Sequence, residues 1–410
     1  MASVLTVEYF LSGGSTHITS SLLLEGYAMV KALCEALRWI GWKVVVPVDE
    51  RLAPHVDLRA TEIVPVKPGA LFSLLSKGLG TDFALAIAPP MGGAHAMLVK
   101  ALEEGGLKHA GPPSWKVERY VDKYRQIEEL RKRGIPTPKT EAIDDLSPRK
   151  IKELSSMGFP LVLKPRLGAG CEGLFVAEDA KDLEKAAAMD IVSEGYLAQE
   201  ALNGVHASAS VFSDGLETWA PCLNAQFIEW GRRPSYEGGL TPLDHPVVER
   251  ALRVAEEAVR ALGLEGCVGV DLVLTDSEAY VVEVNPRPTT SVVSLSEVLG
   301  RGLLGSLLAS VGLKSLRRLT KYKRRWRLAC AFIKARSPVE GPLSADVRRR
   351  LLTAGAYVVT PMIGWVEAGE PISIVRATAP SVSAALSRVR ALKARVESLM
   401  TNYTQPDPFC

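Results

Sequence analysis

The sequence predicts a mixed fold, with an α/β layer at the N-terminus followed by an α+β region. Two patterns support this prediction. Short apolar runs alternate with helical periodicity over the first hundred residues, and closely spaced strand patterns dominate the middle of the chain. At 410 residues, the chain is long enough for two or three domains.

The N-terminal part reads as alternating strands and helices. "VLTVEYFL" (residues 4–11), "KVVVPV" (43–48) and "DFALAIAPP" (82–90) are expected strands. A helix is expected from about residue 19 to residue 40, because apolar residues recur there every three or four positions and Gly41 follows. Short strands alternating with helices indicate a parallel sheet. The Gly13-Gly14 turn is compatible with a close approach to a ligand and equally with an ordinary strand-to-helix turn.

The helical pattern breaks at Gly111-Pro112-Pro113, which predicts a domain joint. We therefore expect an N-terminal α/β domain over residues 1–112, a central region over 113–312 that opens with a helix at 123–134, and a C-terminal extension over 313–410. The extension ends in a helix whose apolar stripe is expected to pack against the rest of the fold. That stripe consists of Val382, Leu386, Val389, Leu392, Val396 and Leu399.

Composition excludes several classes of protein. Lys and Arg number 49 against 46 Asp and Glu, and this near balance argues against a chain devoted to nucleic acid. The six cysteines are scattered without a CxxC pair, which suits a reducing compartment better than a disulfide framework. No signal-peptide pattern or membrane span is evident, so we expect a cytoplasmic protein without a membrane partner.

A predicted hairpin carries two acidic residues inside apolar strands. If the turn near Asp276 has three residues, Asp271 lies opposite Glu283, and Asn285 shares the face of Glu283. Opposed like charges destabilise a hairpin unless a cation lies between them, and such oxygen ligands suit Mg²⁺. An exposed hairpin tip with solvated acids is the alternative.

Lys164 lies in an apolar strand pattern and precedes a loop with glycines at 168, 170 and 173. Burying a lysine is costly without an anion, and glycines allow backbone N–H groups to turn towards one. The order differs from a P-loop, in which the lysine follows the glycines. Arg287, between two prolines, supplies fork-shaped donors for a phosphate or carboxylate; a surface arginine in a turn is the alternative.

Taken in order, these motifs resemble the ATP-grasp superfamily from about Trp115 to Leu299. The matching segments are "YVDKYRQ", "FPLVLKPRLGAGCEG", "LAQEALNG", "VGVDLVLT" and "VVEVNPRPT". The resemblance implies an ATP-grasp fold with an N-terminal pre-ATP-grasp domain. It also implies ATP and Mg²⁺ as cofactors, with Mn²⁺ as an alternative metal.

The resemblance further implies roles for individual residues. Lys123 and Lys164 would contact the ATP phosphates, under a loop from Gly168 through Gly170 to Gly173. Glu200 would accept from the adenine amino group, with the backbone of Ala201 and Leu202 completing the hinge. The implied metal ligands are Asp271, Glu283 and Asn285, and Arg287 would stabilise the transferring phosphoryl group.

One position departs from the family pattern. Many members carry a glutamate after the hinge that binds the ribose hydroxyls, whereas this chain reads "NGVHASAS" there. His206 could take that role, or it could be a structural histidine at the start of a strand. A narrower resemblance is to archaeal amide-forming ATP-grasp ligases of the kind that join tyramine to L-glutamate. It is carried by "EYFLSGG", "GAGCEG", "NPRPTT" and "GWVEAGEPISIV".

The resemblance predicts an ADP-forming ligase that joins a small-molecule carboxylate to an amine through an acyl phosphate. Three alternatives stay open: carboxylation through carboxyphosphate, phosphoryl transfer to a hydroxyl, and a non-catalytic ATP-binding module. A homo-oligomer is compatible with the sequence.

Three further segments carry expectations. Residues 223–243 are expected to form a substrate-covering loop, in which Arg232 or Arg233 recognises a carboxylate; an ordinary surface excursion is the alternative. Cys171 is expected to be a small loop residue and not a nucleophile. The basic run at 314–327 is the best candidate for a nucleic-acid contact, but a solvated face or subunit contact is favoured.

Overall fold

The computed structural model describes residues 2–189, 195–316 and 327–401. Its N-terminal part is a four-stranded parallel sheet in the order β3-β2-β1-β4. The strands are β1 (Ser3–Glu8), β2 (Lys43–Asp49), β3 (Glu62–Val66) and β4 (Phe83–Ile87). The helices are α1 (Ser20–Trp39), α2 (Leu71–Leu75), α3 (Ala94–Glu104) and α4 (Ser114–Tyr120), with 3-10 turns at Ala53–His55 and Met91–Gly93. The expected parallel α/β layer is confirmed, and β3 is a strand that the sequence patterns did not reveal.

The helix α1 is buried along most of its length, because it packs between the N-terminal sheet and later parts of the chain. It contacts α9 (Ser291–Val298) and α10 (Arg301–Gly312) as well as strands from the C-terminal region. A helix that is apolar on nearly all sides is typical of such a position. Through α1, the N-terminal part shares one hydrophobic core with the C-terminal part of the chain.

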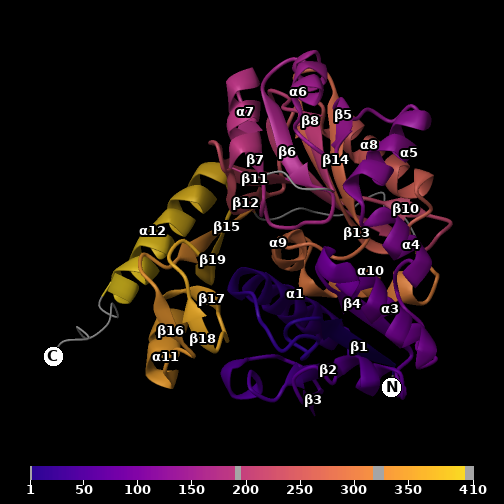
Figure 1. The fold of residues 1–410 in the computed structure, drawn as a ribbon. Helices are drawn as coiled ribbons and strands as arrows, with labels where there is room; N and C mark the ends of the chain where they lie inside the picture. Colours follow the sequence, from indigo (N-terminus) through magenta and orange to yellow (C-terminus); the bar gives the residue numbers. More distant parts are fainter. Residues whose placement is uncertain (1, 190–194, 317–326, 402–410) are drawn as a thin grey trace.

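A second, smaller lobe lies at the top of Figure 1. Its sheet is antiparallel, in the order β5-β8-β6-β7, and α6 and α7 pack beside each other in this lobe. Its elements are α5 (Lys123–Lys132), β5 (Thr140–Ile143), α6 (Pro148–Ser155), β6 (Leu161–Pro165), β7 (Phe175–Ala177), α7 (Ala180–Ala188) and β8 (Tyr196–Glu200). The helix expected at 123–134 is confirmed as α5, and Asp122 caps it by accepting from the backbone N–H groups of Tyr124 and Arg125.

The largest sheet has nine strands and runs β14-β13-β9-β11-β12-β15-β19-β17, with β10 beside β9. Its strands are β9 (Val205–Ser213), β10 (Thr218–Trp219), β11 (Leu223–Glu229), β12 (Ser235–Thr241), β13 (Gly266–Leu274), β14 (Ala279–Asn285), β15 (Arg327–Lys334), β17 (Ala356–Val359) and β19 (Pro371–Ala379). The helix α8 (Val248–Ala261) packs on β9, β13 and β14. Because β12 pairs with β15, this sheet runs across the boundary expected at residues 312 and 313. The three-part division stays a prediction.

The remaining C-terminal elements are β16 (Val339–Gly341), β18 (Gly364–Val366), α11 (Ala345–Ala354) and α12 (Val382–Thr401). The predicted stripe of α12 belongs to the hydrophobic core, with Val389 and Val396 buried and the other four members partly buried against it. The prediction of a packing face is therefore confirmed. Most of the basic run at 314–327 lies outside the described residues.

The segment at 223–243 is not the expected covering loop. It folds into the hairpin of β11 and β12 within the large sheet. The residues 230–234 form the turn of this hairpin, and Arg232 there forms an ion pair with Asp182 on α7 at 2.9 Å. The loop expectation failed because polar residues alternate with apolar ones along the start of β11, which is a strand pattern, and Gly238 and Gly239 lie within β12 and not in a loop.

No helix among residues 2–189, 195–316 and 327–401 is long and apolar enough to span a membrane.

Candidate active site

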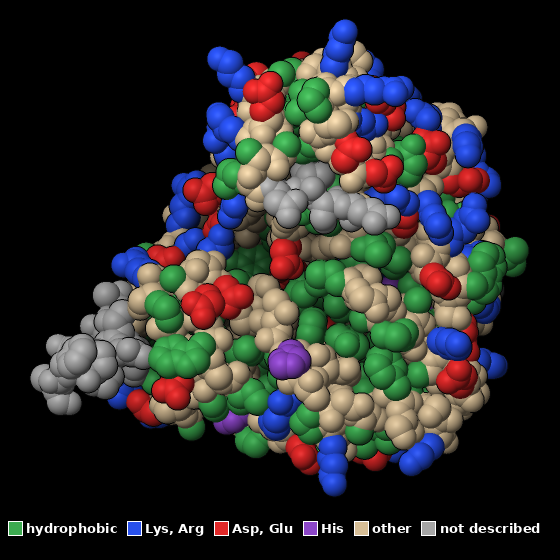
Figure 2. All heavy atoms as spheres, in the orientation of Figure 1, with side chains coloured by type: hydrophobic (Ala, Val, Ile, Leu, Met, Phe, Trp, Pro, Cys, Tyr) green, Lys and Arg blue, Asp and Glu red, His purple; other side chains and the backbone are tan. Residues whose placement is uncertain are grey.

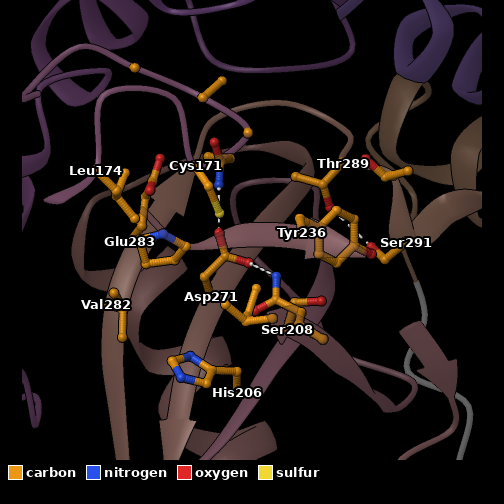
Figure 3. A pocket seen from close by; sticks show the side chains of 18 of the residues that line it. Cys171, Leu174, His206, Ser208, Tyr236, Asp271, Val282, Glu283, Thr289 and Ser291 are labelled. Carbon is orange, nitrogen blue, oxygen red and sulfur yellow. Dashed lines mark hydrogen bonds between the residues drawn. The ribbon is translucent and has the colours of Figure 1, made fainter. Parts of the chain in front are cut away.

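A cavity of about 270 Å³ lies where the upper lobe, the large sheet and the N-terminal part meet. Figure 2 shows a recess beneath the upper lobe, on the face drawn there. The sheet side of the cavity is made by β9, β11, β13 and β14, and Figure 3 shows several of its side chains. Twelve of the thirteen residues that the sequence predicted for the site line this cavity: Lys123, Lys164, Gly168, Gly170, Glu200, Ala201, Leu202, His206, Asp271, Glu283, Asn285 and Arg287.

Gly173 is the thirteenth and does not line the cavity, so its predicted place over the phosphates stays a prediction. It lies at the base of the loop with a φ of +73°, and a Cβ there would come within 2.8 Å of the Pro165 ring. Its glycine identity therefore serves the packing of the loop against β6.

The hairpin of β13 and β14 brings the two predicted carboxylates together. Asp271 pairs directly with Glu283, and Asn285 pairs with Gly269. The predicted pairing is confirmed, although the assumed three-residue turn is wrong. Residues 275–278 form a four-residue turn, and a β-bulge between Asp271 and Leu272 restores the register. The bulge also places the consecutive residues Val282 and Glu283 on the cavity wall, as Figure 3 shows.

Burial and the neighbouring Glu283 raise the pKa of Asp271 well above the ordinary range of an aspartate. Two side-chain amides donate to its carboxylate, Gln226 to Oδ1 at 2.9 Å and Asn285 to Oδ2 at 3.2 Å. Two carboxylates and an amide oxygen form a hard-oxygen donor set that fits Mg²⁺. The donor set contains only two carboxylates. The described residues contain no group of three His, Cys, Asp or Glu side chains arranged to hold a metal. Mg²⁺ commonly completes its shell with water and phosphate oxygens.

Lys123 and Lys164 approach the carboxylates from the upper lobe. The Nζ of Lys123 lies 3.3 Å from Oε1 of Glu283 and donates to the carbonyl of Gly168 at 2.5 Å, so it links the glycine loop to the hairpin. Lys164 is 4% exposed and donates to Oε1 of Gln199 at 2.8 Å. Burial lowers the pKa of Lys164 to about 8, and Glu283 opposes this shift. Both lysines are therefore directed into the cavity where an anion would be stabilised.

Glu200, Ala201 and Leu202 form the far end of the cavity, at the link between the upper lobe and the large sheet. The backbone N–H of Ala201 donates to Pro160 at 3.0 Å, and Oε2 of Glu200 accepts from the backbone N–H of Lys139. The Ala201 amide is thus engaged within the protein and is not free to contact a base. Val162, Val273 and Val282 add apolar surface to the cavity.

His206 is the second residue of β9 and lines the cavity beside Trp230, with ring centroids 5.5 Å apart. Burial lowers its pKa, which favours the neutral imidazole. This position is compatible with contact to a ribose hydroxyl and equally with stacking against Trp230. Cys171 also lines the cavity, and burial raises the pKa of its thiol to about 11. That shift supports the expectation that Cys171 is a small loop residue and not a thiolate nucleophile.

Arg287 lines the cavity between the carboxylates of the hairpin and those of the N-terminal part. Its Nη1 donates to the carbonyl of Pro288 at 3.0 Å, and burial lowers the pKa of its guanidinium. The carboxylates of Glu25, Glu283, Asp271 and Glu8 oppose this shift. Arg232 and Arg233, the other predicted arginines, do not line the cavity.

The sequence patterns missed two groups of lining residues. The first group carries hydroxyls on the sheet and at the start of α9: Ser208, Thr241, Thr289, Thr290, Ser291 and Ser294. Asn224, Gln226 and Tyr236, which the sequence singled out within residues 223–243, do line the cavity. The alternation in "HASASVF" could have indicated Ser208, because Ser208 faces the cavity while Ala207 and Ala209 are buried on the other face of the strand. The second group comes from the N-terminal part and includes Glu8 and Glu25. An acid at the carboxyl end of an apolar parallel strand could have indicated Glu8.

Comparison with known proteins agrees with this geometry. Residues 120–291 match the family model described as the ATP-grasp domain. Tyramine–L-glutamate ligase of Methanocaldococcus jannaschii is 26% identical over 300 residues, which cover 71% of this chain and 84% of that protein. D-alanine–D-alanine ligase A of Bacillus cereus is 24% identical over 271 residues, 63% of this chain and 89% of that protein.

A solved structure extends the likeness over nearly the whole chain. N5-carboxyaminoimidazole ribonucleotide synthetase from Thermotoga maritima superposes with a TM-score of 0.65 at 18% identity, covering 96% of this chain and 98% of that one. At this identity the likeness concerns the fold alone. The predicted ATP-grasp fold is confirmed.

Proposed function

We propose that the protein is an ATP-dependent ligase that joins a carboxylate to an amine through an acyl phosphate and releases ADP and phosphate. One observation carries the proposal. A single cavity is lined by the Glu200–Leu202 link, two buried lysines, a carboxylate pair and Arg287, which together supply the groups that a nucleotide and an acceptor would need.

The first chemical problem is electrostatic, because the γ-phosphoryl group and the attacking carboxylate are both anions. Lys123 and Lys164 would offset charge on the phosphates, and Arg287 would face the transferring group and the attacking carboxylate. Asp271, Glu283 and Asn285 would hold Mg²⁺, which supplies further positive charge at the phosphates. Buried donors act strongly here because little water competes with them.

The second problem is to protect the intermediate. Transfer of the γ-phosphoryl group to a carboxylate oxygen gives an acyl phosphate, and attack by an amine nitrogen at its carbonyl carbon expels phosphate and forms an amide. Water would intercept the acyl phosphate if the cavity stayed open. The loop that contains Gly168 and Gly170 forms part of the cavity wall, and we propose that it excludes water during turnover.

The likeness to tyramine–L-glutamate ligase suggests the first substrates to try. ADP release would be measured with Mg²⁺-ATP and L-glutamate, with and without tyramine, and the products would be analysed by mass. L-glutamate labelled with ¹⁸O in its carboxylates should transfer one ¹⁸O to phosphate. The attacking carboxylate oxygen becomes the bridging oxygen of the acyl phosphate, and phosphate leaves with it when the amine attacks the carbonyl carbon. ADP release that depends on bicarbonate and not on an amine would contradict the proposal and favour carboxylation.

A further inference from the structure

Two carboxylates from the N-terminal part extend the cavity beyond Arg287. Glu8 ends β1, and Glu25 lies in the second turn of α1. Glu8 is 2% exposed, and a Cβ at Gly26 would lie 2.5 Å from its Cδ. The carboxylate of Glu8 therefore packs against the backbone of α1 at Gly26, the residue next to Glu25. The absence of a side chain at Gly26 is what allows this approach.

Neutral donors hold both carboxylates in position. Oε2 of Glu8 accepts from the backbone N–H of Leu11 at 2.7 Å. Oε2 of Glu25 accepts from the hydroxyl of Thr290 at 2.8 Å, and Oε1 of Glu25 lies 3.9 Å from the position of a Cβ on Gly170. Glu25 thus lies between the glycine loop and the segment after Arg287, at the end of the cavity where the acyl phosphate would form.

Among the described residues neither carboxylate is in an ion pair, and the cation that acts on both is Arg287. Within the described ranges, no Lys, Arg or His nitrogen lies within 4 Å of Glu8 or Glu25. Burial raises the pKa of Glu8 to about 8 and also raises the pKa of Glu25, whereas Arg287 acts in the opposite direction. The two carboxylates share one arginine, which also faces Asp271 and Glu283, so a second cation carried by a ligand would be stabilised here.

The surroundings of these carboxylates are apolar. Leu22 and Met29 come from the same face of α1, and Ile87, Ala88 and Pro89 come from the end of β4. A ligand that fits both features has a compact cationic head and a hydrocarbon body. A hydrated metal ion would leave these apolar side chains without a partner.

We propose that Glu8 and Glu25 bind the ammonium group of the amine substrate, and that the apolar side chains beside them hold its carbon body. The ligand class is a primary alkyl- or arylalkylamine. This inference rests on the proposed function, since it assigns one substrate of that reaction to a place in the cavity. The carboxylate substrate then lies on the side of Arg287 that faces the hairpin.

Amine binding can be measured without turnover. The full chain would be saturated with Mg²⁺ and a non-hydrolysable ATP analogue, and tyramine would be titrated by calorimetry. The comparison ligand is 4-ethylphenol, which has the same ring and carbon chain without the ammonium group. We expect 4-ethylphenol to bind at least about tenfold more weakly.

Two variants test the carboxylates themselves. Glu8→Gln and Glu25→Gln should each weaken tyramine binding at least about tenfold while the affinity for the ATP analogue changes less than about threefold. Glu25→Asp keeps the charge and should retain part of the affinity. Glu104→Gln, an exposed residue on α3, is the matched control and should behave as the unaltered protein.

Three results would overturn the inference. These are tyramine affinity unchanged in both glutamine variants, equal binding of tyramine and 4-ethylphenol, and no binding by tyramine, phenethylamine or isopentylamine at millimolar concentration. A circular dichroism melt of each variant separates lost binding from lost folding, and Glu25→Asp provides a second reading if Glu25→Gln fails to fold. The ¹⁸O transfer to phosphate tests the proposed reaction, and calorimetry tests amine binding. Either proposal can therefore fail while the other is supported.

Discussion

The two ends of the cavity differ in how the chain builds them. The end that includes Lys123, Lys164 and the hairpin is made by segments within residues 120–291, and each segment has a recognisable local pattern. The end around Glu8 and Glu25 combines β1, α1 and the region after β4 with residues of the start of α9. In the proposed function the first end binds the nucleotide, and we call it the nucleotide end. The second end would select the substrates, we call it the substrate end, and its parts come from distant places in the sequence.

Arg287 lies between the two ends, so its loss should have the largest effect. We expect Arg287→Ala to lower kcat by about 1,000-fold, because a buried donor to the developing charge would be removed. The dissociation constant for the ATP analogue should change little. Steady-state ADP release and calorimetry would measure the two quantities.

Arg287→Lys is the matched control for Arg287→Ala, since it keeps a charge without the fork-shaped donors. We expect it to recover part of kcat. A large loss of ATP-analogue affinity with kcat preserved would place Arg287 at the nucleotide end only. That result would contradict a position of Arg287 between the two ends.

Lys164→Ala tests the nucleotide end alone. Removal of the Lys164 ammonium group should weaken binding of the ATP analogue about 100-fold, because a buried, charge-assisted contact to phosphate would be lost. Lys181→Ala, on the exposed face of α7, is the control and should bind normally. Calorimetric titration with the ATP analogue would report both. An unchanged affinity in Lys164→Ala would contradict the placement of phosphate beside this lysine.

Glu8 gives the substrate end a pH signature in the ligand-free protein. The pKa of Glu8 is raised from 4.5 to about 8 by burial, so the folded state holds a proton that the unfolded state releases. The stability that this proton contributes is lost as pH rises through the folded pKa, and the free energy of unfolding should fall by roughly 2 kcal/mol between pH 6 and pH 8.

The measurement for Glu8 is urea unfolding at several pH values. Glu8→Gln should remove most of this fall, because glutamine does not titrate, while Glu104→Gln should leave it in place. If the free energy of unfolding fell with pH as steeply in Glu8→Gln as in the unaltered protein, groups other than Glu8 would dominate the pH dependence of stability.

His206→Ala should have the smallest effect, because His206 lies at the rim of the nucleotide end and its alternative role is only to stack on Trp230. We expect KM for ATP to rise about threefold to tenfold, with kcat nearly unchanged, if the imidazole contacts the ribose. His206→Gln keeps a hydrogen-bonding side chain and should lie closer to the unaltered protein. An unchanged KM in His206→Ala would favour the structural role.

Much of the nucleotide end could be predicted from the sequence. Asp271 was placed opposite Glu283 by assuming a three-residue turn. The pairing is right because a four-residue turn and the bulge at Val282 offset each other, which the sequence pattern does not specify. Lys164 and its glycine loop are contiguous in the chain. Spacing cannot distinguish a glycine that faces a ligand from one that packs against Pro165, as Gly173 does.

The substrate end was decided by tertiary structure. Nothing local distinguishes Glu25 from any other acid on a helix, and its burial follows only when α1 is enclosed by both the N-terminal sheet and α9. Arg232 had the right chemistry for a carboxylate, yet the hairpin of β11 and β12 carries it to Asp182 on α7. By itself the sequence determined the elements and the residue types for nucleotide chemistry, because these depend on short-range periodicity and spacing. Which distant side chains share one buried volume depends on how the layers pack, and only the tertiary structure decided that.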